Sequence, residues 1–103
     1  MKWCCVSFKS LYEGAGHRGF AILVEQDETL GPLFIWQHRA VEQQDEKKLQ
    51  AWKTDFPVSL VSDTGLLFCP WCGKNLRKFY GRHASELVRP GYAIPLPISA
   101  EPA

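Results

Sequence analysis

Four cysteines are the residues of this chain whose type and spacing could do chemistry. Cys69 and Cys72 stand two residues apart in the stretch LFCPWCGKNL, and the remaining two, Cys4 and Cys5, are adjacent near the N-terminus. A pair of thiols with two intervening residues can hold a metal ion, carry out thiol–disulfide exchange or form a structural disulfide. Each of these chemistries predicts a different kind of protein.

A zinc site is the first possibility. In C-P-W-C-G the proline pre-sets the turn and Gly73 allows a positive φ, so both thiolates can point at one ion. A structural zinc needs four ligands, usually a mix of cysteine and histidine. Cys4 and Cys5 could complete the set, but neighbours on a regular strand point to opposite faces, so both bind only if the backbone bends there. Otherwise a histidine replaces one of them, and the candidates are His17, His38 and His83.

A thiol-redox pair and a structural disulfide fit the sequence less well than a zinc site. Thioredoxin-like folds place their cysteine pair early, at the start of a helix, whereas only 31 residues follow Cys72 and the last fourteen are rich in proline. Gly73 also disfavours a helix that begins at that point. A disulfide between Cys69 and Cys72 would close a very small loop and does not suit a reducing compartment. No serine, histidine and aspartate are placed together as a hydrolase would need, so we expect no catalytic residues.

The composition favours a small soluble domain. The chain has 103 residues, 46% of them hydrophobic, and a net charge of +1, which is not the basic excess of a dedicated nucleic-acid binder. No apolar run approaches the roughly 18 residues that span a bilayer, and the N-terminus lacks the apolar core of a signal peptide. We therefore expect a cytoplasmic protein with no membrane partner, built as one domain over residues 1–89 and a proline-rich tail over residues 90–103.

The predicted fold class is α+β, with a small antiparallel sheet and one helix, closed by a zinc-ribbon knuckle. Residues 20–25 and 33–38 are rich in β-favouring side chains and predict an antiparallel hairpin. Apolar residues at helical spacing predict a helix over residues 42–53. Further strands are expected at residues 3–8, 58–61 and 66–68, a turn at 62–65 and a short helix within 75–83. The tail, with four prolines, is expected to extend neither a helix nor a central strand, and to be flexible or to lie against the domain or a partner.

The cysteine motif resembles that of a known group of proteins. F-C-P-W-C-G-K-N-L, together with a Cys-Cys pair near the start followed by Phe8, is similar to small, mostly uncharacterised bacterial and phage zinc-ribbon proteins. The resemblance covers about residues 3–78, and this chain continues well beyond its knuckle. It implies a structural zinc held by Cys69 and Cys72 with one or both of Cys4 and Cys5. It implies no enzymatic activity. Because zinc binding can contribute on the order of 10 kcal/mol to folding, we expect the metal-free protein to be unfolded or loosened.

Three functions remain open from the sequence. A protein-interaction or adaptor module would use Trp71 at the knuckle tip, the sheet surface or the tail. A nucleic-acid-binding ribbon would use basic residues that alternate with aromatic ones after the knuckle, namely Lys74, Arg77, Lys78 and Arg82 within residues 74–89. A thiol-redox protein would use Cys69 and Cys72. The adaptor module, with an unidentified protein partner, is the preferred hypothesis.

Overall fold

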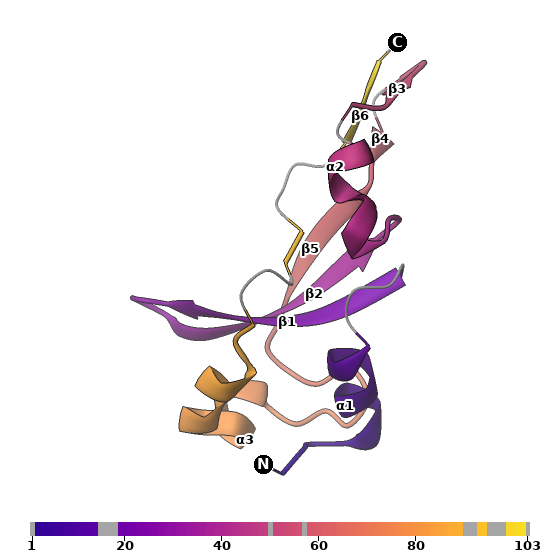
Figure 1. Cartoon of the computed structure of the whole chain (residues 1–103). Helices are drawn as coiled ribbons and strands as arrows, with labels where there is room; N and C mark the ends of the chain where they lie inside the picture. Colours follow the sequence, from indigo (N-terminus) through magenta and orange to yellow (C-terminus); the bar gives the residue numbers. More distant parts are fainter. Residues whose placement is uncertain are drawn as a thin grey trace.

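The chain folds as an α+β protein in the computed structural model, which describes residues 2–14, 19–49, 51–56, 58–89, 93–94 and 99–102 (Figure 1). Three strands form an antiparallel sheet in the order β1-β2-β5: β1 (Gly19–Asp27), β2 (Gly31–Arg39) and β5 (Val61–Leu66). Helices α1 (Val6–Glu13) and α3 (Leu76–Tyr80) lie together at one end of the molecule, on the same side as the N-terminus. The 3-10 helix η2 (Gly81–Leu87) continues from α3 and contacts β1.

The β1–β2 hairpin confirms the strands predicted at residues 20–25 and 33–38. Its register runs from Gly19 opposite Arg39 to Asp27 opposite Gly31. The Asp27 carboxylate accepts the backbone N–H groups of Thr29 and Leu30 at 2.8 and 2.7 Å, and these bonds hold the pKa of that carboxyl below its usual range. Gly31 follows with φ of 80°, a conformation that glycine adopts without strain. Asp27 and Gly31 therefore fix the turn that joins the two strands.

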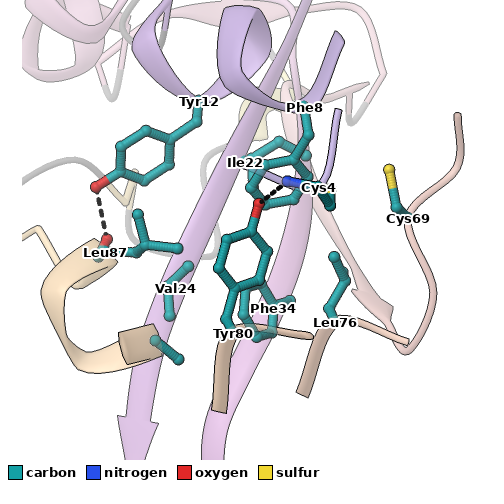
Figure 2. Packing of buried hydrophobic residues seen from close by; sticks show 11 residues of the cluster. Cys4, Phe8, Tyr12, Ile22, Val24, Phe34, Cys69, Leu76, Tyr80 and Leu87 are labelled. Atoms are coloured by element: carbon teal, nitrogen blue, oxygen red, sulfur yellow. Dashed lines mark hydrogen bonds between the residues drawn. The ribbon is translucent and has the colours of Figure 1, made fainter. Parts of the chain in front are cut away.

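The main hydrophobic core lies between one face of the sheet and the helices. Ile22 and Val24 of β1 pair across the ladder with Trp36 and Phe34 of β2, so their side chains share a face. Figure 2 shows Phe8 and Tyr12 of α1 and Tyr80 of α3 packed around Ile22, Val24 and Phe34. The Tyr12 hydroxyl donates to the Leu87 carbonyl at 2.9 Å. This core joins the first turns of the chain to the segment after the knuckle.

Several local predictions were wrong or only partly right. Residues 3–8 do not form a strand, because helix α1 begins at Val6 and places Phe8, Leu11 and Tyr12 on its core-facing side. Residues 62–65 are not a turn but part of β5, where an edge strand tolerates the exposed Ser62, Asp63 and Thr64. The helix expected over residues 42–53 is reduced to η1 (Gln43–Asp45) and α2 (Glu46–Leu49).

The segment after the knuckle confirms the short helix expected there. Asn75 caps α3, since its side-chain oxygen accepts the Lys78 N–H at 3.0 Å. The chain turns into η2 at Gly81, whose φ is 51°. The predicted strand at residues 58–61 is split into β4 (Val58–Ser59) and the start of β5, and residues 66–68 give only Leu66 to a strand.

The C-terminal segment reaches the opposite face of the sheet. Ile94 is buried with Val41, Leu60 and Val61 in a second hydrophobic cluster. The fully buried Gln37 amide donates to the Ile94 carbonyl and accepts the Ile94 N–H, both at 3.1 Å. The described part of the tail thus lies against the domain, one of the two expected arrangements.

A second small sheet contains the last described residues. Strand β6 (Ser99–Pro102) lies between β3 (Lys53–Thr54) and β4, parallel to the first and antiparallel to the second. The expectation that the tail supplies no central strand was wrong, because residues 99–101 are free of proline and can donate to a neighbour. None of the helices in the described ranges is long and apolar enough to cross a membrane.

Candidate metal centre

The N-terminal half of the site depends on a bend at Cys4. Cys5, with φ of −162° and ψ of 166°, is the N-cap of α1, and its Sγ accepts the Phe8 N–H at 3.4 Å. The capping residue of a helix normally offers an oxygen to this amide, and here a sulfur takes its place. Because the chain changes direction between an extended segment and a helix, the adjacent Cys4 and Cys5 side chains converge instead of diverging. The bend that two adjacent ligands require is therefore present.

The C-terminal half of the site is a tight knuckle between β5 and α3. The Gly73 N–H donates to the Cys69 carbonyl and the Cys69 N–H donates to the Lys74 carbonyl, both at 2.9 Å. Gly73 has φ of 78°, a conformation that L side chains rarely adopt. Phe68 and Asn75 form an isolated antiparallel bridge that closes the base of the loop. The sequence C-P-W-C-G therefore folds into the turn that its proline and glycine predict.

The two halves bring all four thiols together. The Sγ atoms of Cys4, Cys5, Cys69 and Cys72 all lie within 4.8 Å of one another, and those of Cys5 and Cys69 are 3.7 Å apart. A tetrahedral zinc site with Zn–S bonds of about 2.3 Å has sulfurs about 3.8 Å apart, whereas a disulfide joins sulfurs at about 2.05 Å. All four cysteines are free thiols. The spacing is consistent with a bound metal such as zinc.

Tyr80 links the knuckle helix to the N-terminal cysteines. Its hydroxyl accepts the Cys4 N–H at 3.1 Å, and its ring packs against Phe8 and Phe34 with centroids 5.4 and 5.6 Å apart (Figure 2). The ring is almost completely buried. Tyr80 therefore supports the site from outside the ligand set, which is how residues behind a metal ligand usually act.

Burial makes the inner thiols poor acids. Desolvation raises the pKa of Cys4 to about 12, against a hydrogen bond from Tyr80 that lowers it. It also raises the pKa of Cys69, although the backbone N–H groups of Cys72 and Trp71 oppose this by donating to the sulfur. The pKa of Cys72 is lowered, chiefly by the Lys74 N–H, and this side chain is exposed. Two buried sulfurs thus need a positive charge to stabilise their thiolates, and a divalent cation supplies one.

The donor set fits zinc. Four sulfur ligands in a tetrahedral arrangement are typical of structural zinc sites, which leave no open position for water or substrate. Cys4 and Cys69 face the core, Cys5 is half-buried and Cys72 lies at the surface. Such a site would bind helix α1 to the knuckle and so close the fold at the end opposite the C-terminal segment (Figure 1).

The candidate histidine ligands lie elsewhere or outside the described residues. The cluster found among the described residues consists of cysteines alone. His38 lies on β2 with its ring against Trp36 and Phe20, and the exposed His83 is 3.5 Å from the Glu86 carboxylate. His17 falls outside the described residues. Both Cys4 and Cys5 are in position, so the arrangement does not call for a histidine.

The predicted contact residues all lie at the surface, and three of them also make contacts within the chain. Trp71 is 40% exposed, yet its ring stacks on Trp36 at 5.4 Å. Arg77 donates to the Pro32 carbonyl at 3.0 Å and the Lys74 ammonium lies over the Phe79 ring at 4.8 Å. Lys78 and Arg82 are exposed. Lys74 and Arg77 are exposed as well, so all four basic side chains lie at the surface, and their role in binding stays a prediction.

Sequence reasoning missed the residues that join the two halves. Tyr80 carries no motif of its own, and Phe8 was noted only as part of the cysteine motif and not as a core residue. The helical spacing of Phe8, Leu11 and Tyr12 is the signal that could have identified α1. The pair Cys69 and Cys72 ends before α3 begins at Leu76, so it does not open a helix as a thioredoxin-like pair would.

Comparison with known proteins adds no relatives. No protein-family model, no curated protein and no solved structure matches the chain. The likeness to zinc-ribbon proteins therefore depends on the cysteine motif and on the cluster that it forms.

Proposed function

We propose that the four cysteines bind one zinc ion and that this ion is structural. The observation that carries the proposal is the convergence of four Sγ atoms within 4.8 Å from two segments more than sixty residues apart. Cys4 and Cys5 would supply two thiolates from the start of α1, and Cys69 and Cys72 would supply two from the knuckle. Zinc would neutralise the buried sulfurs and fix the first turns of the chain against α3.

Native mass spectrometry of single Cys→Ser variants tests this function. We expect one zinc per chain in the wild type, and zinc loss with loosened folding in Cys4→Ser, Cys5→Ser, Cys69→Ser and Cys72→Ser. Ser7→Ala is the matched control, because Ser7 is an exposed neighbour of the N-terminal pair. A folded wild type that takes up no zinc would contradict the proposal and would favour a thiol-redox function.

The zinc-stabilised domain would serve as a protein-interaction module, not as an enzyme. Support comes from large apolar side chains exposed next to the metal centre, since Leu67 and Phe68 precede Cys69 and are 66% and 56% exposed. Exposed apolar residues grouped in this way mark interaction surfaces more often than isolated ones do. In a cross-linking experiment, the double variant Leu67→Ser/Phe68→Ser should lose the specific partners that the wild type captures. The control Trp52→Ser/Phe56→Ser changes two side chains that are exposed at another place in the chain, and it should keep those partners. Identical partners for both variants would contradict this assignment.

A further inference from the structure

A column of aromatic rings runs along strand β2. Trp71 of the knuckle stacks on Trp36 with centroids 5.4 Å apart and planes 23° apart, and Trp36 stacks on His38 at 6.0 Å and 22°. Trp36 and His38 are two residues apart on one strand, so they share a face of the sheet. The same face carries Phe20 of β1, which pairs with His38 in the register. The column is therefore a fixed feature of the sheet.

Phe20 stands beside Trp36 and His38, at nearly the same distance from both rings. Its ring is nearly perpendicular to both neighbours, at 79° to Trp36 and 78° to His38, with centroids 5.0 and 5.1 Å away. Phe20 is 45% exposed. The exposed Phe20 ring and the His38 ring stand at a right angle to each other. Together they offer a planar ligand one surface for stacking and another for an edge contact.

A pocket of about 430 Å³ begins where the column ends. His38 and Phe20 line it, whereas Trp36, one step further back, does not. The β4–β5 junction also lines the pocket and contributes Ser59, Leu60 and Ser62. This volume lies within the range of about 300–1,000 Å³ that is usual for small-ligand sites.

The pocket walls are held in place by the second hydrophobic cluster. The Ala40 N–H donates to the Leu60 carbonyl at 2.9 Å and joins the end of β2 to the β4–β5 junction. Leu60 and Val61 are buried against Val41 and Ile94. Ser62 lies directly opposite His38 in the β2–β5 register. The site is thus formed without any rearrangement of the described backbone.

We propose that this pocket binds a nucleoside or mononucleotide by its base. Two rings at a right angle suit a flat heteroaromatic ligand, and base–aromatic stacking is tolerant of the base. Serine hydroxyls and a histidine on the rim can form hydrogen bonds to the polar edges of a base. A ligand with a plain phenyl ring has no such polar edge, so the pocket favours a base. No acidic side chain is among the described residues that line the pocket, so a phosphate is not repelled.

A single nucleotide fits these surroundings better than a nucleic-acid strand does. The only basic residue besides histidine that lines the pocket in the described ranges is Arg39, whose side chain is buried and donates to Gln37 at 2.8 Å. A strand would need a run of exposed cations along its phosphates. Binding at this pocket does not depend on the zinc proposed above.

Chemical-shift mapping of the ¹⁵N-labelled full chain, purified with zinc, tests the proposal. Titration with AMP and UMP should shift the amides of Phe20, His38 and Ser62 saturably, with a Kd on the order of 1 mM or lower. Ribose 5-phosphate, which has no base, should not shift them. Equal shifts with ribose 5-phosphate, or shifts confined to the basic segment after the knuckle, would overturn the proposal.

Variants separate the pocket from general effects. Phe20→Ala and His38→Ala should weaken AMP binding by roughly five- to 150-fold, whereas Phe56→Ala, an exposed ring elsewhere, should leave it unchanged. Ser62→Phe should fill the pocket from the neighbouring strand β5 and keep both rings, which guards against a ring variant that fails to fold. Binding of a decamer of adenylate without binding of AMP would also overturn the proposal, in favour of a nucleic-acid surface.

Discussion

Replacing Tyr80 with phenylalanine removes an oxygen atom that joins the knuckle helix to the N-terminal cysteines. The Tyr80 hydroxyl accepts the Cys4 N–H at 3.1 Å in a buried position, so Tyr80→Phe leaves that amide without its partner. An unsatisfied buried group of this kind costs about 1–3 kcal/mol. For a domain near 100 residues, each kcal/mol lowers the melting temperature by roughly 4–8 °C. The zinc-loaded variant should therefore melt several degrees below the wild type.

The same substitution should also weaken zinc binding. Loss of a residue that supports a metal ligand typically reduces metal affinity by about 10–100-fold. Tyr12→Phe is a matched control, because Tyr12 is also buried and its hydroxyl donates to the Leu87 carbonyl at 2.9 Å. If folding and metal binding are coupled, each 1.4 kcal/mol of lost stability alone lowers the apparent zinc affinity by about tenfold. The specific effect of Tyr80 is therefore the loss of zinc affinity in Tyr80→Phe beyond the loss in Tyr12→Phe.

Competition with a chelator of known affinity measures both variants. We expect Tyr80→Phe to bind zinc at least about tenfold more weakly than Tyr12→Phe, and the zinc-loaded Tyr80→Phe protein to melt at the lower temperature of the two. Equal zinc affinities in the two variants would refute the claim that Tyr80 supports the metal centre, even if both were less stable than the wild type.

Three further predictions concern the knuckle, the tail and pH. Gly73→Ala should destabilise the zinc-loaded protein by about 1–2 kcal/mol in a urea titration, because Gly73 has φ of 78°, which is costly for alanine. An added Cβ meets nothing within 4 Å, so this backbone cost is the whole expected effect. An unchanged midpoint would show that the knuckle does not require a glycine at this position. Gln37→Leu should lower the free energy of unfolding by about 2–4 kcal/mol, because it removes the partner of both backbone groups of Ile94. It should also speed proteolysis after residue 89. An unchanged cleavage rate would show that this contact does not hold the tail. Zinc should be lost as the pH falls, because the pKa of the unfolded Cys4 thiol is near 9.0 and burial raises it to about 12 in the metal-free fold. Protons therefore compete with zinc, and stability should rise with pH by up to about 1.4 kcal/mol per unit for each thiol below pH 9; a pH-independent zinc affinity between pH 5 and 8 would contradict thiolate ligation.

The sequence predicts the parts of this protein that carry strong local signals. The β1–β2 hairpin follows from two runs of β-favouring residues, and the knuckle follows from a proline and a glycine around Cys69 and Cys72. The grouping of four cysteines follows from counting ligands, once a bend at Cys4 and Cys5 is allowed. The hairpin and the knuckle depend on residues close together in the chain, whereas the cysteine grouping joins distant segments and was predictable because the chain has four cysteines, the number of ligands that a structural zinc needs.

Features that depend on distant contacts could not be predicted. Helix α1 has only eight residues, so its stability comes from the packing of Phe8 and Tyr12 against the sheet and not from helix propensity. Ser62, Asp63 and Thr64 have the composition of a turn, but their backbone is held in β5 by pairing with β2. The position of β6 between two strands, and the hold of Gln37 on Ile94, likewise arise only when the ends of the chain meet the sheet.

X-ray absorption at the zinc edge tests the central claim most directly. Reconstituted protein should show four sulfur neighbours at about 2.3 Å and no nitrogen neighbour. Three sulfurs and one nitrogen at about 2.0 Å would contradict the four-cysteine site and return a histidine to the ligand set.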